Sequence, residues 1–376
     1  MLFITKRMIP ILQRLLPITT RSIIFGMSFF LFAFFFSVFC TLPSYADPTY
    51  SIKLLNTPAG YFRPRVTSVN NNGDIVFSAG SDITNRKLFS YKYSSSIFTE
   101  ISVAIGWAAN RTRILDNGTI IGGTCIGETP CTNALFKRTG NTTQLIQITA
   151  ESTDIPNYSI NDFSVNSAGE IAVFGTNGAD IYYIHIIHSD LSISKIAEWS
   201  RDKTDPGYFR NFTNAGHVIF SNKILETASG SFVDYDLGIN YSEMTPLASS
   251  DNSIVIIEYL KNNGGSMDEG WGFYEATKAS FTNQDPEQRL VSPSGYFVNA
   301  SKVVAGLCSI NINGVLYQNF LKEELGNMNI FSLSDTGFLA GSDITSDDDS
   351  SPSLFIAKLN SQAYNIQSIT PLLLDN

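Results

Sequence analysis

Aromatic residues and arginines recur together at four places in this chain. Each place begins with Gly-Tyr-Phe or Gly-Trp, and three of the four carry arginine within the next seven residues. The members are Tyr61, Arg63, Arg65, Trp107, Arg111, Arg113, Tyr208, Arg210 and Tyr296. Arginine forms paired hydrogen bonds with carboxylate, sulfate or phosphate, and Tyr or Trp offers a flat face to a sugar ring. If one surface collects these segments, they predict binding of an anionic small molecule, a glycan or a protein partner.

The charge balance sets these arginines apart from the rest of the chain. The sequence has 25 Lys+Arg and 34 Asp+Glu. Without the four basic residues of the N-terminal leader described below, 21 remain against 34, a net charge of −13. Five of the nine remaining arginines belong to the aromatic–Arg segments. An acidic protein repels nucleic acid, so we expect no nucleic-acid partner and a local reversal of charge at these segments.

A competing interpretation of the same segments is structural. Gly-Tyr-Phe can pack between repeats as a recurring core contact, with each arginine paired to a neighbouring acid. Consensus residues of repeat proteins usually serve this kind of stacking. From the sequence alone, both interpretations stand.

The other candidates for chemistry are weaker. His185 and His188 lie three residues apart in an expected strand, so they point to opposite faces and cannot share a metal. His217 follows a turn and has no evident serine or cysteine partner. The acidic run Asp347–Asp349 lacks the Asp-x-Asp-x-Asp-Gly spacing of a calcium loop. We therefore expect no metal and no cofactor, and we assign no catalytic residue.

A short turn followed by an apolar run recurs along the chain and must position these segments. The clearest copy is Asn70–Gly73 before Asp74–Gly80, and Asn-Gly between two apolar runs is a strong hairpin signal because both residues accept positive φ. The corresponding turn positions are 73, 118, 169, 216, 253, 301 and 337, which are 36 to 51 residues apart. A period of about 45 residues is the length of a four-stranded propeller blade.

Further strand-like runs follow several of these turns, so each period is expected to be a four-stranded antiparallel meander. The predicted fold class is all-β, a seven-bladed β-propeller of four-stranded antiparallel blades. The run 50–55 resembles an outermost strand and is expected to close the ring against the C-terminal blade, where the run 364–369 competes for the same place. The only helix candidate after the leader is Asn319–Leu325.

The order of strands in a blade predicts where the aromatic–Arg segments lie. Each segment precedes the first strand of a unit, and the loops before the first strand share one face of an up-and-down propeller with the loops after the second strand. We therefore expect the segments to converge on one mouth of the central channel. The loop Asp343–Ser350 should lie on the same face.

The turns resemble those of the extracellular HAF-repeat family, whose units carry an Ile-Asn-x-x-Gly-x-Val-x-Gly core. The resemblance covers the units at 73, 169, 216 and 337 best. The run Asn133–Phe136 resembles the family's His-Ala-Phe strand, with no histidine present. The resemblance implies a secreted β-propeller-like repeat protein and no defined activity.

The first 46 residues have the composition of a signal peptide. Four basic residues precede the apolar segment 23–40, and small residues surround Ser44-x-Ala46. We expect cleavage after residue 46 and a single propeller domain over 47–376, exported to the periplasm or the cell exterior. The alternative is a protein anchored in the membrane by residues 23–40, because about 18 apolar residues is the lower limit for a spanning helix.

Cys125 and Cys131 lie in a loop-like stretch rich in Gly and Thr. In an oxidising compartment they are expected to form a small disulfide, and two free thiols are the alternative.

The function most consistent with these patterns is a secreted or periplasmic binding or surface-interaction module for an anionic or glycan ligand, without catalysis. Two alternatives remain. One is a glycan-acting hydrolase of propeller fold, which needs two carboxylates within about 5–10 Å of each other beside the arginines. The other is a structural scaffold without a ligand, in which replacing Arg63 and Arg210 changes stability alone.

Overall fold

The computed structural model describes most of the chain after the leader. The described residues are 49–80, 86–103, 111–126, 132–178, 180–200, 205–238, 241–264, 266–284, 296–306, 309–312, 315–317, 326–346 and 351–360. The predicted leader, Trp107, Cys131, the helix candidate at 319–325 and the run 364–369 lie outside these ranges. Within them, no helix is long and apolar enough to cross a membrane.

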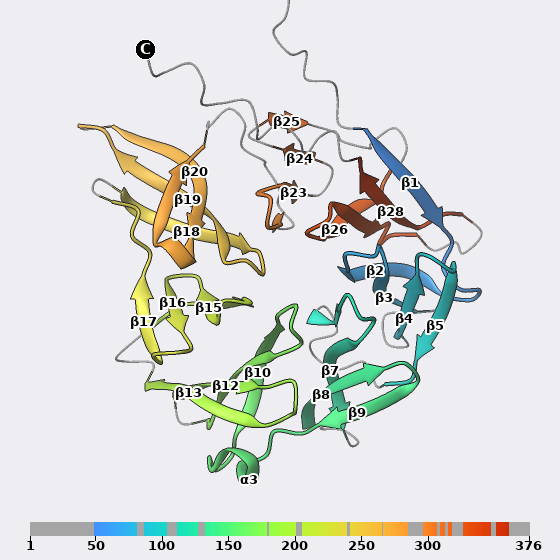
Figure 1. The fold of residues 1–376 in the computed structure, drawn as a ribbon, viewed down its shortest axis with the longest axis horizontal. Helices are drawn as coiled ribbons and strands as arrows, with labels where there is room; N and C mark the ends of the chain where they lie inside the picture. The colour runs from blue at the N-terminus through green and yellow to red at the C-terminus, as the bar shows by residue number, and fades with distance from the viewer. Residues whose placement is uncertain are drawn as a thin grey trace, which may run out of the picture. The chain divides into compact units, whose positions relative to one another are not determined.

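Seven four-stranded antiparallel sheets follow one another around a ring, which confirms the predicted seven-bladed β-propeller (Figure 1). Blade 1 contains β2 (Phe62–Val69), β3 (Ile75–Gly80), β4 (Arg86–Lys92) and β5 (Ile97–Ile101). Blade 2 contains β6 (Arg113–Ile114), β7 (Ile120–Ile126), β8 (Thr132–Thr139) and β9 (Thr142–Ile146). Blade 3 contains β10 (Ser159–Val165), β11 (Ile171–Thr176), β12 (Ile181–Ile187) and β13 (Ile193–Ser200).

The remaining blades have the same strand order. Blade 4 contains β14 (Phe209–Phe212), β15 (His217–Phe220), β16 (Lys223–Glu226) and β17 (Ser231–Asp234). Blade 5 contains β18 (Tyr241–Ser249), β19 (Ile254–Asn262), β20 (Met267–Glu275) and β21 (Ser280–Asn283). Blade 6 contains β22 (Tyr296–Val298), β23 (Val304–Gly306), β24 (Ser309–Ile312) and β25 (Val315–Tyr317). Blade 7 contains β26 (Asn329–Leu333), β27 (Phe338–Ser342), β28 (Leu354–Leu359) and, from the other end of the chain, β1 (Tyr50–Leu55).

Strand β1 closes the ring. It pairs antiparallel with β28 over its full length, from Tyr50 opposite Leu359 to Leu55 opposite Leu354. The sequence left two runs competing for this place, and the structure gives the outermost position of blade 7 to the N-terminal one. Because β1 leads along the chain into β2 of blade 1, its main-chain hydrogen bonds with β28 tie the start of the chain to blade 7. Side-chain packing between blades 1 and 7 adds to this closure.

The same hydrogen-bonded turn joins the first two strands of all seven blades. In each, the backbone N–H of the first turn residue donates to the carbonyl oxygen of the fifth, and its carbonyl oxygen accepts from the N–H of the fourth, as Asn70 does with Asp74 and Gly73. The fourth residue has positive φ in every blade, and five of the seven are glycine. In blade 6 this residue is Lys302 (φ 59°), so the sequence-based assignment of position 301 was wrong by one residue. That turn lacks the glycine which marks the position in five of the blades.

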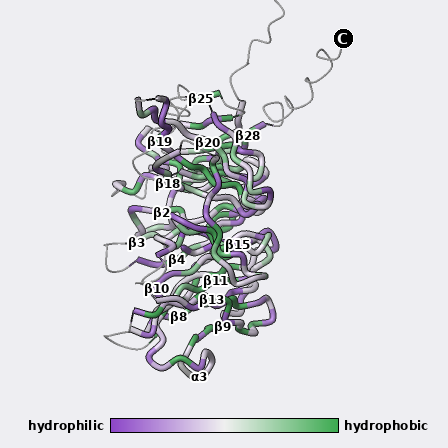
Figure 2. The backbone as a smooth tube through the Cα atoms, turned by 90° about the vertical axis from the view of Figure 1, so that its left-hand side faces the viewer, coloured by the Kyte–Doolittle hydropathy of each residue, from purple (hydrophilic) through white to green (hydrophobic). Residues whose placement is uncertain are grey.

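Seven hydrophobic clusters hold the ring together, one between each pair of adjacent blades. Strand β3 shows why each blade needs two neighbours. Its residues Ile75 and Phe77 pack against blade 7, while Val76 between them packs against blade 2. Strand side chains alternate between faces, so a run that is apolar throughout has two faces to bury. In side view, hydrophobic residues accordingly recur through the blades rather than in one layer (Figure 2).

One short helix was not predicted. Helix α3 (Ala150–Thr153) is a single turn between blades 2 and 3, closed by a capping box in which Thr149 and Ser152 each bond the other's backbone N–H. A single turn carries no hydrophobic period, so its formation depends on these local caps.

Candidate ligand-binding channel

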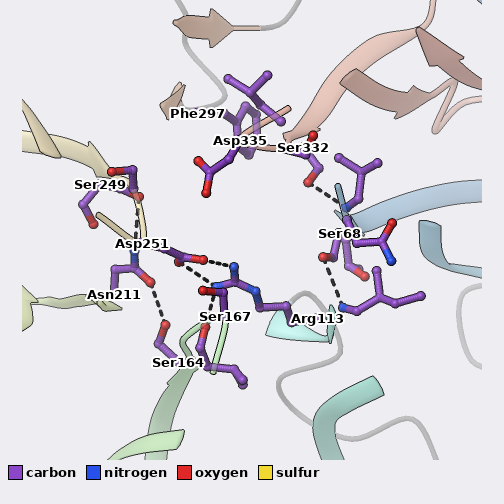
Figure 3. Close-up of a pocket in the computed structure, with 18 of the residues that line it drawn as sticks. Ser68, Arg113, Ser164, Ser167, Asn211, Ser249, Asp251, Phe297, Ser332 and Asp335 are labelled. Carbon is purple, nitrogen blue, oxygen red and sulfur yellow. Dashed lines mark hydrogen bonds and ion pairs between the residues drawn. The ribbon is translucent and has the colours of Figure 1, made fainter. Parts of the chain in front are cut away.

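The first strand of each blade lines a central cavity of about 380 Å³ (Figure 3). Its wall combines Ser, Thr and Asn with apolar residues in equal number, and it carries six charged side chains. Hydrogen bonds between neighbouring blades satisfy many of the polar groups that line the cavity. They run from Ile114 N to Ser68 Oγ (3.2 Å), Phe212 N to Ser164 Oγ (3.1 Å), Ser164 Oγ to Asn211 Oδ1 (2.7 Å), Asn211 Nδ2 to Ser249 O (3.1 Å) and Val69 N to Ser332 Oγ (3.0 Å). The polar lining therefore stabilises the ring as well as facing the cavity.

Arg113 crosses the cavity from blade 2 to blade 5. Its Nη1 lies 2.8 Å from Asp251 Oδ1, its Nη2 bonds Asp251 Oδ2, and Nη1 also donates to the carbonyl oxygen of Val165. Burial lowers the pKa of Arg113, but the charges of Asp251, Asp335 and Asp116 outweigh it and the pKa is raised. The pair is a bidentate, largely desolvated contact, the strong form of an arginine–carboxylate interaction. Figure 3 shows the guanidinium in the middle of the cavity.

Asp335 faces this pair from blade 7. Its Oδ1 accepts a hydrogen bond from Ala300 N at 2.8 Å. Burial raises the pKa of Asp335, and the charges of Asp251 and Asp116 raise it further, against the opposing effects of that hydrogen bond and of Arg113. Arg113 thus lies among three carboxylates, those of Asp116, Asp251 and Asp335, and the pKa of Asp335 is raised.

Arg111 and Arg210 stand closer to the mouth. Arg111 Nη2 lies 2.8 Å from Asp162 Oδ2, and Arg111 Nη1 donates to the carbonyl oxygen of Arg210 at 3.1 Å. Burial raises the pKa of Asp162, while Arg111 and the N–H of Phe163 lower it. Arg111 is therefore satisfied within the protein, and it fixes the backbone from which Arg210 projects.

Tyr208 and Arg210 border a second cavity of about 490 Å³ that also contains Arg111, Asn161 and Asp162. The side chain of Tyr208 is 75% exposed, and the Arg210 guanidinium lies 5.9 Å from the centre of its ring. Between them in the sequence, Phe209 is buried against blade 3. Within the described residues, no carboxylate forms an ion pair with Arg210.

The predicted site residues divide into two groups. Arg111, Arg113, Arg210 and Tyr296 line the central cavity, and Tyr208 lines the adjoining one. The remaining described members, Tyr61, Arg63 and Arg65, belong to blade 1 and line neither cavity. Trp107 lies outside the described residues. That all the segments form one site stays a prediction.

The aromatic residues divide in a similar way. Tyr61 packs edge-on against Phe89 with ring centres 4.9 Å apart, and Tyr296 packs against the cluster between blades 5 and 6. These two tyrosines follow the packing interpretation, and so does the pairing of Arg111 and Arg113 with acids. Tyr208 does not, because most of its side chain faces solvent.

Sequence reasoning missed the acids that accompany the arginines and one further arginine. Asp162, Asp251 and Asp335 come from blades 3, 5 and 7, and Arg86 lies beside Arg65 on blade 1. Asp251 and Asp335 each occupy the second position of a blade turn, next to the channel. That shared position in the repeat was the signal that could have identified them.

Each histidine contacts residues of its own blade or of the next one. His217 Nδ1 lies 3.0 Å from Ser253 Oγ, so the prediction that it has no serine partner was wrong; the turn of the next blade supplies it. Ser253 is fully buried and donates onward to Thr213, which makes the contact a link between blades 4 and 5. His185 contacts Tyr158, and burial lowers its pKa to about 4. Among the described residues, no three His, Cys, Asp or Glu side chains are placed to hold a metal ion.

The face predicted for the loop Asp343–Ser350 is supported where the loop is described. Arg63 N donates to the carbonyl oxygen of Ser346 at 2.9 Å, so the start of β2 and the loop after β27 meet on one face. Cys125 lies in β7 and its predicted partner Cys131 is outside the described residues, so the disulfide stays a prediction.

No family model matches the sequence, and no curated protein matches it either. Several solved structures resemble the fold. An oligogalacturonate lyase in complex with manganese aligns with a TM-score of 0.54 and 9% identity, covering 85% of this chain and 98% of that one. The β-propeller domain of the Trilobed protease from Pyrococcus furiosus aligns with a TM-score of 0.49 and 11% identity, covering 78% of this chain and 95% of that one. YCF48 bound to D1 peptide aligns with a TM-score of 0.47 and 12% identity, covering 87% of this chain and 99% of that one. At 9% identity, the first likeness extends to the fold and not to the activity.

Proposed function

We propose that this protein is an exported β-propeller of the HAF-repeat kind that binds an acidic glycan or another anionic ligand at the mouth of its channel. The observation that carries the proposal is the pairing of Tyr208 and Arg210 beside an open cavity. Arg210 has no carboxylate partner among the described residues, and the neighbouring ring is exposed. An aromatic face beside an available guanidinium suits a sugar ring that carries a carboxylate or sulfate.

The surroundings of this pair support a preformed site. The backbone of Tyr208 is held by two hydrogen bonds with Ser221, from Tyr208 N to Ser221 Oγ (2.8 Å) and from Ser221 N to Tyr208 O (2.9 Å). Arg111 holds the carbonyl oxygen of Arg210 on the other side. A ligand then meets side chains whose backbone is already fixed, which reduces the entropy lost on binding.

A hydrolase is the second candidate because Asp251 and Asp335 interact electrostatically inside the cavity. A carboxylate with a raised pKa beside a second carboxylate is a pattern found at general acids. Against this candidate, both oxygens of Asp251 are engaged by Arg113, whose guanidinium fills the centre of the cavity. We therefore favour binding without catalysis.

The test is a screen of the purified protein against neutral and acidic oligosaccharides, followed by titration calorimetry. We expect binding to acidic members alone, and a loss of affinity of about tenfold or more for Arg210→Ala and for Tyr208→Ala, the size expected for one charge-assisted contact or one stacking contact. Arg138→Ala is the control, because Arg138 lies on blade 2 and bonds only the Gly140 carbonyl among the described residues. An absence of binding to every acidic glycan would overturn the proposal.

The two rival functions give different outcomes in the same experiment. A hydrolase would release shorter products from a bound glycan, and Asp335→Asn would stop their release while binding persists. Export is tested separately by sequencing the N-terminus of the protein recovered from outside the cytoplasm, where we expect it to begin at Asp47.

A further inference from the structure

A glutamate, a histidine and a serine form one chain of contacts at the edge of blade 3. The imidazole of His188 lies between the other two: its Nδ1 is 3.2 Å from Glu170 Oε1, and its Nε2 is 3.1 Å from Ser194 Oγ. Glu170 directly precedes β11, His188 directly follows β12, and Ser194 belongs to β13. None of the three lines either cavity described above.

The carboxylate decides where the imidazole proton lies. An ionised carboxylate only accepts hydrogen bonds, so a neutral His188 carries its hydrogen on Nδ1, toward Glu170. Nε2 is then an acceptor, and the hydroxyl of Ser194 donates to it. A serine that donates to a histidine oriented by an acid is the arrangement of an activated nucleophile. These three roles recur on unrelated folds in different orders along the chain, so they are recognised by geometry.

A buried asparagine holds the acid in place. Asn166 begins the turn between the first two strands of blade 3 and is 1% exposed. Its Nδ2 donates to Glu170 Oε2 at 3.0 Å, and its Oδ1 accepts from Glu170 N at 3.0 Å. One carboxylate oxygen is therefore anchored to the blade while the other faces the histidine, which fixes the direction of the imidazole.

A tight turn holds the histidine and the serine at the other end of the blade's hairpin. His188 N donates to the carbonyl oxygen of Ser192, and Leu191 N donates to the carbonyl oxygen of His188, both at 2.9 Å. Leu191 has φ 71°, in the left-handed region that a residue with a side chain rarely adopts. Backbone held in such a region is found most often at functional sites. The turn returns the chain so that Ser194 pairs with Ile186 of β12, beside the histidine.

Solvent reaches these side chains. His188 and Glu170 are 39% and 34% exposed, and Ser194 is half-buried. The contact between His217 and Ser253 differs, because Ser253 is fully buried and a substrate cannot reach it. The strand order of the blade places the exposed group on the face of the ring opposite the mouth with Tyr208 and Arg210.

We propose that Ser194, His188 and Glu170 form a catalytic site that hydrolyses small carboxylic esters. Ser194 Oγ attacks the carbonyl carbon of the ester while its proton passes to His188 Nε2. The bond from that carbon to the alcohol oxygen then breaks, and His188 gives the proton to the leaving alcohol. A water molecule, deprotonated by His188, next attacks the acyl-serine. The carboxylic acid leaves, and Ser194 Oγ recovers its proton from His188.

The exposure of the site limits the substrate class. Charge that develops in a transition state is stabilised less in an open, wet site than in a buried one. An alcohol leaves a tetrahedral intermediate more easily than an amine does, so the site suits esters rather than amides. Glu170 touches no reacting atom in this scheme and is a positioning residue for His188.

The first test is covalent labelling with a fluorescent phosphonyl fluoride. Attack by the serine oxygen forms a phosphorus–oxygen bond and releases fluoride, and the stable product is located by mass spectrometry. We expect label on Ser194 in the folded protein and none after heat denaturation. This measurement uses the wild type, so it does not depend on a variant that folds. No label on Ser194, or equal labelling of the denatured protein, would overturn the proposal.

Variants then separate catalysis from a structural role of the turn. Ser194→Ala should lose the label, and Ser192→Ala should keep it. Ser192 is the matched control because it lies two residues away and its hydroxyl donates to Asp190 Oδ1 at 2.7 Å instead of to a histidine. His188→Gln should slow labelling by about 100-fold or more, the lower end of what a general base contributes. Equal loss of label in Ser192→Ala and Ser194→Ala would show that these residues only hold the turn.

Hydrolysis of 4-nitrophenyl acetate tests the positioning residue, with Ser194→Ala as the background. Glu170→Gln should lower kcat by about tenfold or more and leave KM unchanged, because the carboxylate acts on the histidine and not on the bound ester. A variant with normal kcat and a lower thermal midpoint of unfolding would show that Glu170 serves stability alone, and would remove it from the site.

This proposal and the binding proposal fail separately. A protein that binds acidic glycans but takes no label on Ser194 lacks the esterase site alone. A protein that is labelled on Ser194 but binds no acidic glycan lacks the ligand site alone. Ester hydrolysis also leaves glycosidic bonds intact, so it is distinct from the glycan hydrolase considered for the channel.

Discussion

Arg65 of blade 1 and the arginines of blade 2 come from the same repeated segment but have opposite surroundings. On blade 2, Arg111 and Arg113 reach into the channel and meet Asp162 and Asp251. On blade 1, Arg65 and Arg86 lie side by side and bond no carboxylate among the described residues. The paired arginines link blades 2, 3 and 5, whereas the hydrogen bonds of Arg86 stay within its own blade.

The difference shows that residue type and repeat position do not fix the role of a charge here. Arg113 uses its guanidinium to hold the ring, so little of it is left for a ligand. Arg65 is exposed and keeps its donors available. The first arrangement predicts a loss of stability on mutation, and the second predicts a small gain of stability.

The largest effect is expected for Arg113→Ala. It leaves the Asp251 carboxylate buried without its partner, and breaking such a pair costs about 3–5 kcal/mol in the free energy of unfolding. Urea denaturation measures the change. The double variant Arg113→Ala with Asp251→Ala should recover part of the lost stability, because no buried carboxylate is then left without a partner. A loss below about 1 kcal/mol would show that the pair does not hold the ring.

Arg111→Ala should cost less, about 1 kcal/mol, because its pair with Asp162 is roughly one-quarter to one-third exposed and water can replace the lost contact. The expected secondary effect is on Arg210, whose carbonyl oxygen loses a donor. We therefore expect weaker acidic-glycan binding as well as lower stability. Unchanged binding would show that Arg210 does not need this support.

Asp335 should make stability depend on pH. Its pKa is higher in the folded protein than the ordinary value of 3.8. At a pH between 3.8 and that raised pKa, the folded state therefore binds more protons than the unfolded state. Stability attributable to Asp335 should therefore fall as pH rises through that window. Urea midpoints from about pH 3 to about pH 7 should show a smaller decline in Asp335→Asn than in the wild type. Identical slopes would contradict the assignment.

The smallest effect, and one of opposite sign, is expected for Arg65→Gln at low salt without a divalent anion. Relief of like-charge repulsion should stabilise the fold by about 0.2–0.5 kcal/mol. Added NaCl should remove the difference by screening. A lower urea midpoint in the variant would instead show that Arg65 is paired within the chain. The arginines of blade 1 would then be paired, as those of blade 2 are.

The sequence predicted the fold well because its signals are local. The turn at Asn70–Gly73, its recurrence and the flanking apolar runs are each read within about ten residues. The prediction failed by one residue at Lys302, where no glycine marks the turn. The site was predicted less well: Arg111, Arg113, Arg210 and Tyr296 do share the channel, but Tyr61, Arg63 and Arg65 do not, and the acidic partners were missed.

By itself, the sequence determined the number of blades, the turn between the first two strands of each and the positions of the arginines, because these depend on neighbours along the chain. Only the tertiary structure decided which arginine meets an acid. Arg111 and Asp162 are 51 residues apart, and Arg113 and Asp251 are 138 apart. They meet because the ring brings first strands of different blades around one axis, where a charge is either paired across the channel or left facing solvent.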